Sequence, residues 1–437
     1  MLAILGNRTY RHLFAAQVIA LLGTGLATVA LALLAFDLAG ADAGSVLGTA
    51  LAIKMLAYVS VAPFAAGVTE RLPRRATLVV LDLVRAGVAL ALPFVTEVWQ
   101  IYLLIFLLQS ASAAFTPTFQ ATIPDVLPDE KDYTRALSLS RLAYDLESLL
   151  SPMLAAALLT VLSFHDLFLG TVLGFIASAA FVLSVTLSAP KRSAQQSVWK
   201  RTTKGLRLFF ATPRLRGLLA INMAVAAAGA MVIVNTVVII QGTFTLSDTA
   251  TALAFSAFGA GSMIAALALP KLLECLPDRA VMLSGATLLA TGLLAGLLVT
   301  DFALLLPLWL LLGVGFAAAQ TPAGRLLRRS SHPEDRPALF AAQFALSHAC
   351  WLVTYPLAGW LATSAGLSVA FLVLSGLVGI GLVAALFLWP SQDAGVLEHD
   401  HSDLPDDDPH WEEGHERGGR RHAHAYIIDD LHREWPS

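Results

Sequence analysis

The sequence predicts an all-α integral membrane protein whose twelve transmembrane helices form two pseudo-symmetric halves of six helices each. Three observations carry this prediction: the composition, the number of long apolar stretches and an internal repeat. Of the 437 residues, 57% are hydrophobic and only 14% are charged, and the mean hydropathy is +0.71. Soluble domains carry about 25% charged residues. The composition therefore excludes an ordinary soluble domain.

The apolar stretches are long enough to cross a bilayer, because a spanning helix needs about 20 mostly apolar residues. Twelve stretches qualify, at residues 13–38, 45–68, 76–95, 100–121, 136–162, 166–188, 215–240, 249–273, 280–300, 302–323, 338–363 and 368–389. The chain then divides into a first half (1–188), a cytoplasmic joining loop (189–214), a second half (215–390) and a cytoplasmic, largely disordered tail (391–437).

Positive charge gives the predicted orientation. If the N-terminus lies in the cytoplasm, 25 of the 28 lysine and arginine residues fall in cytoplasmic segments, and the six opposite loops hold none. Cytoplasmic loops of membrane proteins are enriched in these residues. We therefore expect a multi-pass protein of a bacterial-type inner (plasma) membrane with both termini in the cytoplasm.

An internal repeat relates the two halves. The segment "ERLPRRA" begins at residue 70 and "ECLPDRA" begins at residue 274, an offset of 204. Pro152 and Pro356 are separated by the same offset. Parallel repeats related by an axis along the membrane normal are one plan of secondary transporters, which bind substrate near the midplane between the halves. The repeat therefore predicts alternating access by rocking of one half against the other.

The loop after the second span carries a family motif. The stretch "AGVTERLPRRATLVVLDLVRA" (66–86) resembles the Gly-x-x-x-Asp-Arg-x-Gly-Arg-Arg loop of the major facilitator superfamily, and the resemblance extends over residues 8–390. Ala66, Glu70 and Pro73 stand where the motif has glycine, aspartate and glycine. The motif's arginines match at Arg71, Arg74 and Arg75.

Two further segments, "DLVRA" (82–86) and "PTFQATIPDVLP" (117–128), resemble the exporter branch related to drug:proton antiporters. The resemblance implies a secondary active exporter. It also implies that the loop with Glu70, Arg71, Arg74 and Arg75 helps to hold the outward-facing state through salt bridges at the cytoplasmic face.

Two charge pairs lie inside the predicted spans. Asp82 and Arg85 are three residues apart, and Arg141 and Asp145 are four apart, so each pair can meet on one helix face. Charges in the bilayer interior are costly and are functional candidates by default. We interpret the first pair as a structural brace to the Arg71 loop and the second as an intrahelical pair. A transport role is the alternative for both.

Glu147 is the leading candidate for a proton carrier. It lies about half-way along the fifth span, and no basic residue stands three or four positions away. Ser140, Tyr144, Glu147 and Ser151 form a polar stripe at helical spacing. A buried carboxyl without a charged partner can exchange its proton near neutral pH. Alternatively its partner is on another helix, and Lys54 in the second span is the candidate.

His348 occupies the repeat position of Tyr144, because the two numbers differ by 204. A lone membrane histidine is often a helix-packing residue, and a proton or metal role is the alternative here. Asp37 is interpreted as a wetted helix end and Cys350 as a small core residue.

The tail contains seven of the eleven histidines within its last 39 residues, among many acidic residues. They are His399, His401, His410, His415, His422, His424 and His432. Imidazole and carboxylate ligands suit Ni(II), Zn(II), Co(II) or Cu(II). We therefore expect Ni(II) or Zn(II) binding at the tail and no other cofactor, with a merely solvated acidic tail as the alternative. The closing "AYIIDDLHREWPS" has the apolar residues needed to dock on the membrane domain.

An exporter-type body with a histidine-rich cytoplasmic C-terminus resembles the nickel-resistance permeases of the same superfamily. The resemblance implies proton-coupled export of a divalent metal such as nickel. Two alternatives stay open: a drug or metabolite exporter whose tail only senses or buffers metal, and a metal sensor or scaffold without transport. No catalytic motif or P-loop occurs, so we expect no enzyme and an ion gradient as the energy source. The expected partners are the bilayer, protons and a small substrate, with no nucleic acid, and the chain is expected to be a monomer.

Overall fold

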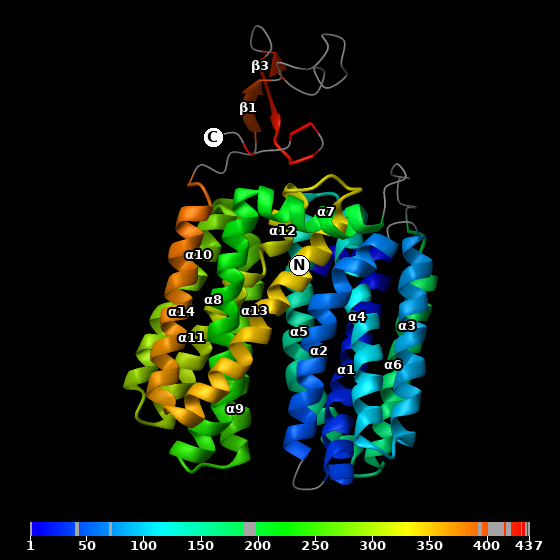
Figure 1. Ribbon diagram of the computed structural model, residues 1–437, viewed down its shortest axis with the longest axis vertical. Helices are drawn as coiled ribbons and strands as arrows, with labels where there is room; N and C mark the ends of the chain where they lie inside the picture. Colours follow the sequence, from blue (N-terminus) through cyan, green and yellow to red (C-terminus); the bar gives the residue numbers. More distant parts are fainter. Residues whose placement is uncertain are drawn as a thin grey trace.

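The computed structural model describes residues 2–39, 43–69, 72–187, 198–391, 396–400, 415–416, 421–429, 431–432 and 435. Twelve long helices occur in this part of the chain, and they form two bundles side by side (Figure 1). The predicted all-α membrane fold is confirmed.

The first half contains η1 (Leu2–Gly6), α1 (Arg8–Ala39), α2 (Ala43–Thr69), α3 (Arg74–Ala91), η3 (Leu92–Phe94), α4 (Val98–Val126), α5 (Glu130–Leu158) and α6 (Phe164–Leu183). The joining segment contains α7 (Val198–Ala211). The second half contains α8 (Pro213–Val237), the π-helical turn η4 (Val238–Thr243), α9 (Asp248–Cys275), α10 (Asp278–Ala295), η5 (Gly296–Leu298), α11 (Phe302–Gln320), α12 (Ala323–Arg329), α13 (Arg336–Ser364) and α14 (Leu367–Leu388).

Ten of the described helical segments have the length and hydropathy of a membrane span. Of the other two long helices, α2 has only a shorter apolar stretch, Ala52–Ala65, within the described residues. α5 is the remaining one, and it carries Arg141, Asp145 and Glu147 in its middle. These three charged residues, which are among the predicted transport residues, account for the lower hydropathy of α5.

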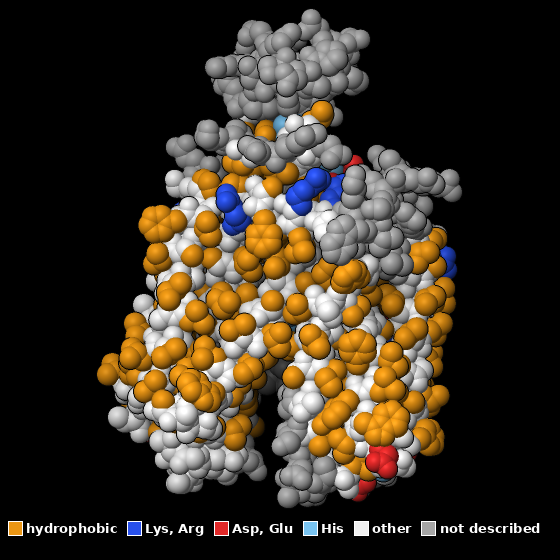
Figure 2. Space-filling view, in the orientation of Figure 1, with side chains coloured by type: hydrophobic (Ala, Val, Ile, Leu, Met, Phe, Trp, Pro, Cys, Tyr) orange, Lys and Arg blue, Asp and Glu red, His pale blue; other side chains and the backbone are white. Residues whose placement is uncertain are grey.

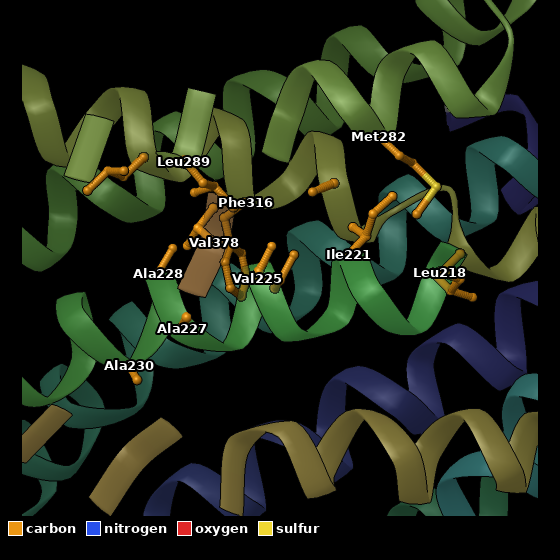
Figure 3. Packing of buried hydrophobic residues seen from close by; sticks show 14 of the residues in the cluster. Leu218, Ile221, Val225, Ala227, Ala228, Ala230, Met282, Leu289, Phe316 and Val378 are labelled. Carbon is orange, nitrogen blue, oxygen red and sulfur yellow. The ribbon is translucent and has the colours of Figure 1, made fainter. Parts of the chain in front are cut away.

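Each half has its own apolar core. In the second half, Leu218, Ile221 and Val225 of α8 share one face and pack toward Leu289 of α10 and Phe316 of α11 (Figure 3). In the first half, two buried clusters follow one another along the bundle. Because each half buries its side chains internally, the halves can move against each other without disrupting either core.

The two halves meet at one end of the bundle and separate at the other. α7 and α12 lie across the closed end, here called the α7 end, and Figure 2 shows a cleft between the halves that opens at the opposite end. Between the halves, α2 packs against α13 and α5 packs against α9. An apolar cluster of Ala62 and Ala113 from the first half with Phe344 and Ala345 of α13 is buried between the two halves.

The tail extends beyond the α7 end (Figure 1). Its described residues include three short strands in the order β1-β3-β2, namely β1 (Val396–Asp400), β2 (His415–Glu416) and β3 (Arg421–Ala425). Both pairings are antiparallel. The prediction that the tail as a whole is largely disordered stays a prediction, because much of the tail lies outside the described residues.

The closing segment docks on the second half, as the sequence predicts. Tyr426 and Ile428 are buried in the core of that half. Arg214 at the start of α8 donates a hydrogen bond to the Tyr426 carbonyl (3.3 Å), and its guanidinium lies 4.9 Å from the ring centroid of Trp435. The apolar and aromatic residues of this segment therefore anchor the end of the chain.

Candidate transport site and gate

α2 and α13 pack against each other at the boundary between the halves. Lys54 and Tyr58 are four residues apart on one face of α2, and the Lys54 Nζ lies 5.7 Å from the Tyr58 ring centroid. Across the boundary between halves, the Tyr58 ring contacts the rings of His348 (4.7 Å) and Phe344 (4.9 Å). The Tyr58 hydroxyl donates to the Gln109 side chain (2.7 Å). The structure thus brings the predicted residues Lys54 and His348 together through Tyr58.

His348 is held in one orientation. Its Nδ1 lies 2.7 Å from the carbonyl oxygen of Phe344 one turn earlier, so this nitrogen carries the proton when the ring is neutral. The Nε2 atom is then an acceptor.

Glu147 lies on α5, half-buried, on the wall of the first half. Its carboxylate points at Gly25 of α1, where a Cβ would come within 2.7 Å of the Glu147 Oε1. The charges of Glu147 and Lys54 act on each other, yet neither residue forms an ion pair within the described part of the chain. The two charges therefore interact from different helices without forming an ion pair with each other.

Tyr144 stands one turn before Glu147, and 37% of its surface is exposed. Gln17 of α1 is a hydrogen-bond partner of its hydroxyl and also accepts from Ser140 (3.0 Å). The predicted polar stripe of α5 therefore pairs with a polar residue of α1. The sequence pattern of α5 did not point to Gln17.

Arg141 joins the two halves. The predicted pair with Asp145 is confirmed at 2.7 Å, and the same guanidinium donates to Ser262 of α9 (2.9 Å) and to Gln320 of α11 (3.0 Å). It also lies 4.8 Å from the Phe316 ring. The interpretation as a purely intrahelical pair is incomplete, because these contacts join α5 of the first half to α9 and α11 of the second half.

Asp82 and Arg85 also form the predicted pair, and both are buried. Ser178 of α6 donates to Asp82 (2.8 Å), and the Arg85 guanidinium lies 3.9 Å from the Phe115 ring and 4.5 Å from the Phe175 ring. The pair therefore links α3, α4 and α6 inside the first half. Its expected connection to Arg71 lies outside the described residues.

Arg74 of the motif loop takes part in a cross-half ion cluster at the α7 end. It pairs with Asp125 at the end of α4, and Asp125 also pairs with Arg336 at the start of α13 (2.5 Å). Arg75 donates to the Leu183 carbonyl. The other two predicted loop residues, Glu70 and Arg71, lie outside the described residues.

A second ion cluster is centred on Asp278, the first residue of α10. It pairs with Arg325 (2.8 Å) and Arg329 (3.2 Å), and Arg325 reaches Glu130 of the first half (2.6 Å). Arg74 and Asp278 are separated by 204 residues, and so are Asp125 and Arg329. The two clusters are therefore repeat-related ion pairs with reversed charge. The sequence analysis missed Asp125 and Asp278, although the repeat offset and the charged helix starts were visible signals.

The tail histidines are only partly described. His401 and His410 lie outside the described residues. For His399, His415, His422 and His424 the backbone is described and the side chains are not. No group of three or more potential metal ligands occurs among the side chains that the structure describes.

His432 is buried and belongs to the docked segment. Its Nδ1 lies 3.0 Å from one Asp429 carboxylate oxygen, and the Nε2 of His332, between α12 and α13, lies 3.4 Å from the other. The hydrogen bond to Asp429, opposed by partial burial, raises the pKa of His332. Burial alone would raise the pKa of Asp429, but the hydrogen bonds from His332 and His432 outweigh it and lower that pKa.

Comparison with known proteins identifies the family. The model of the Major Facilitator Superfamily matches residues 13–237 and 218–403, which together include both six-helix halves. The chain belongs to the major facilitator superfamily. It is thus a multi-pass secondary transporter of small substrates and not an enzyme. No curated protein sequence matches this transporter.

Three solved structures of transporters have the same fold at low identity. The human organic anion transporter MFSD10 (TETRAN) has a TM-score of 0.76 and 14% identity, with 86% of this chain and 99% of that chain covered. A bacterial homologue of the iron transporter ferroportin in the outward-facing state has a TM-score of 0.74 and 13% identity, covering 87% and 99%. FucP in the outward conformation has a TM-score of 0.67 and 14% identity, covering 87% and 99%.

Proposed function

We propose that this transporter is a proton-coupled exporter of the inner membrane in which Glu147 carries the proton. The observation that carries the proposal is the position of Glu147. It is a half-buried carboxylate beside Gly25 of α1 whose charge interacts with that of Lys54, and it forms no ion pair within the described residues. A carboxylate held in this way can exchange its proton with one side of the membrane at a time.

Charge and the shape of the cleft support the assignment of this conformation, while export itself rests on the resemblance of the sequence to the exporter branch. The basic residues at the α7 end make this end the cytoplasmic one by the positive-inside rule. The cleft opens at the opposite end, so the conformation corresponds to an outward-facing state. The bacterial ferroportin homologue and FucP, two of the similar structures, are also described as outward. An exporter in this state would accept a proton from outside and release its substrate there.

The geometry favours an organic substrate over a bare metal ion. Lys54 lies beside Tyr58 and acts electrostatically on both Glu147 and His348, the two potential metal ligands of the cleft. A lysine charge so close repels a divalent cation. Aromatic rings line the same region. We therefore place the sequence-based nickel hypothesis second for the transported substrate.

Metal binding by the tail is a second candidate function, and the strand register favours it. The backbone pairs His399 with His422 in β1 and β3, and Glu416 of β2 with the same His422. Residues of metal-ligand type thus occupy one row across three strands. Imidazole with carboxylate suits Ni(II) or Zn(II). In this role the tail gathers or senses metal in the cytoplasm, whether or not metal is the transported substrate.

The test uses everted membrane vesicles with a respiration-driven pH gradient reported by a fluorescent weak base. Amphipathic organic compounds and Ni(II) are added in turn to vesicles containing the full chain, Glu147→Gln, or Glu334→Gln as a control on an exposed carboxylate at the α7 end. We expect organic compounds, and not Ni(II), to dissipate the gradient with the full chain and the control but not with Glu147→Gln. Dissipation that survives Glu147→Gln would overturn the proposal.

The tail is tested separately by equilibrium dialysis of Ni(II) and Zn(II) with the full chain and with a chain that ends at Pro390. Binding by the first and its loss in the second would support the tail as a metal site. Equal binding by both chains would refute it.

A further inference from the structure

Lys54 and Glu147 lie close enough for their charges to interact, yet they form no ion pair with each other. Opposite charges in a site of low dielectric attract strongly. Lys54 and Glu147 nevertheless form no ion pair with any described residue. Lys54 lies against the Tyr58 ring, and Glu147 lies against Gly25 of α1, on a different helix. Packing on separate helices therefore holds the two charges apart, so each can take a partner from a substrate.

An aromatic surface lies beside these charges. Phe344, His348, Trp351 and Tyr355 recur at intervals of three or four residues and thus share one face of α13. The first two contact Tyr58, and the last two contact each other with ring centroids 4.9 Å apart. Such rings favour an apolar, flat body and add contacts to a cationic group.

We propose that the substrate is an amphipathic zwitterion: its carboxylate binds Lys54, its ammonium binds Glu147, and its apolar or aromatic body lies on the α13 face. This inference rests on the proposed function and names the substrate class of the same site. A purely anionic or purely cationic ligand would leave one of the two protein charges desolvated without a partner, which is costly. A zwitterion satisfies both.

The charge balance agrees with antiport. The empty site, with Lys54 protonated and Glu147 ionised, is neutral, and it stays neutral with a zwitterion bound. A proton on Glu147 removes the carboxylate that the ammonium needs, so proton and substrate exclude each other. A simple anion would behave differently: it would bind Lys54 best when Glu147 is protonated, and would move together with the proton. The substrate's charge pattern therefore determines whether the site exchanges or cotransports.

The experiment compares matched compounds in three ring sizes: phenyl, indolyl and naphthyl. Each ring is carried by an amino acid, by the amine without the carboxylate, and by the acid without the amine; for indole these are tryptophan, tryptamine and 3-indolepropionate. Transport of each compound into proteoliposomes containing the full chain is measured with and without a pH gradient. We expect the amino acid to be transported at least about ten times faster than its two partners in at least one ring series, because each unpaired charge costs more than 1.4 kcal/mol.

Variants separate the roles of the two charges, with Lys271→Gln as the control on an exposed lysine. Lys54→Gln should remove the advantage of the amino acid over the amine. Glu147→Gln should remove its advantage over the acid and should also abolish the response to the pH gradient.

The proposal is wrong if the amine, the acid or Ni(II) is preferred in every ring series, or if no compound of any series is transported. Zwitterion preference without any effect of the pH gradient would instead leave the substrate class intact and overturn proton coupling by Glu147.

Discussion

At the scale of single residues, Tyr58 connects most of the groups in the cleft. Its ring contacts Lys54, His348 and Phe344, and its hydroxyl bonds to Gln109. The ring and the hydroxyl can be tested apart, because phenylalanine keeps the first and removes the second. Sequence reasoning did not identify Tyr58, since nothing in the pattern of α2 distinguishes it from an ordinary tyrosine at a helix interface.

Tyr58→Phe should change transport by less than about fivefold, because a single neutral hydrogen bond contributes about 1 kcal/mol. Tyr58→Leu removes the ring under Lys54 and should weaken substrate affinity by about tenfold or more, since a desolvated cation–π contact is worth up to about 2 kcal/mol. Concentration-dependent uptake into proteoliposomes measures both variants. Equal losses in the two variants would show that the ring contact with Lys54 has no special role.

At the scale of elements, the starts of α3 and α10 hold the two repeat-related ion clusters at the α7 end. These two clusters, centred on Asp125 and Asp278, are here called the gate. Arg74 begins α3 and Asp278 begins α10, and each pairs with a residue of opposite charge at the end of a later helix, Asp125 of α4 or Arg329 of α12. Each cluster also reaches the other half, through Arg336 or Glu130. Because the charges are reversed between the repeats, the contact between the halves is Asp125 with Arg336 in one cluster and Arg325 with Glu130 in the other.

Asp278→Asn should weaken closure of the α7 end, because Arg325 and Arg329 lose the carboxylate that they share. Breaking a buried pair from one side costs about 3–5 kcal/mol. The exchange Asp278→Arg with Arg329→Asp restores this ion pair with the charge order of Arg74 and Asp125, and should recover part of the closure.

The readout for closure is the rate of chemical cross-linking between Lys131→Cys and Glu274→Cys. These positions belong to different halves, and the charged atoms of the native side chains are 3.8 Å apart. The background carries Cys275→Ser to remove the exposed native thiol. A double exchange that cross-links no faster than Asp278→Asn would contradict the pairing.

The docked end of the tail is a second element with a specific pH dependence. The raised pKa of His332 and the lowered pKa of Asp429 keep both members of this ion pair charged over a wide range of pH. The stabilisation from His332 is complete at acidic pH and is lost as the pH rises through its raised pKa, whereas that from Asp429 is lost only in strong acid. Docking of the last segment of the tail is therefore strongest at pH values between the lowered pKa of Asp429 and the raised pKa of His332.

Asp429→Asn should destabilise the protein by about 1 kcal/mol at pH ~6 and by less at pH ~9, after allowance for the partial exposure of the pair. The midpoint of thermal unfolding at the two pH values measures this difference. Asp37→Asn, at an exposed position on α1, is the control. A loss that is the same at both pH values would mean that the histidine bond does not contribute.

At the scale of the whole molecule, the sequence predicted what repetition and hydropathy encode. The long helices, the two halves and the docking of the last segment all follow from local composition. The sequence could not predict Tyr58 with His348, Asp125 with Arg336, or Arg141 with Gln320. These are contacts between halves, and they depend on how one rigid bundle is tilted against the other. The helix α7 was not assigned for a related reason: it is stabilised by packing on α13 and α2.

Protonation of Glu147 and opening of the gate must be coupled through the whole molecule. If Glu147 is the carrier, its protonation must favour one state of the cleft over the other, because a ligand shifts an equilibrium only through unequal affinity for the two states. The ion clusters at the α7 end then open or close in response. Glu147 lies in the cleft and away from these clusters, so the coupling requires movement of whole halves.

The most direct measurement is the distance between spin labels at Lys131→Cys and Glu274→Cys, recorded across a range of pH by pulsed electron resonance. The background carries Cys275→Ser, which removes the exposed native thiol from labelling. It also carries Asp429→Asn, which removes the pH-dependent pair with His332. We expect the distance distribution to shift with pH in this protein and to become independent of pH when Glu147→Gln is added. A shift that persists with Glu147→Gln, or no shift in the parent, would contradict Glu147 as the proton carrier.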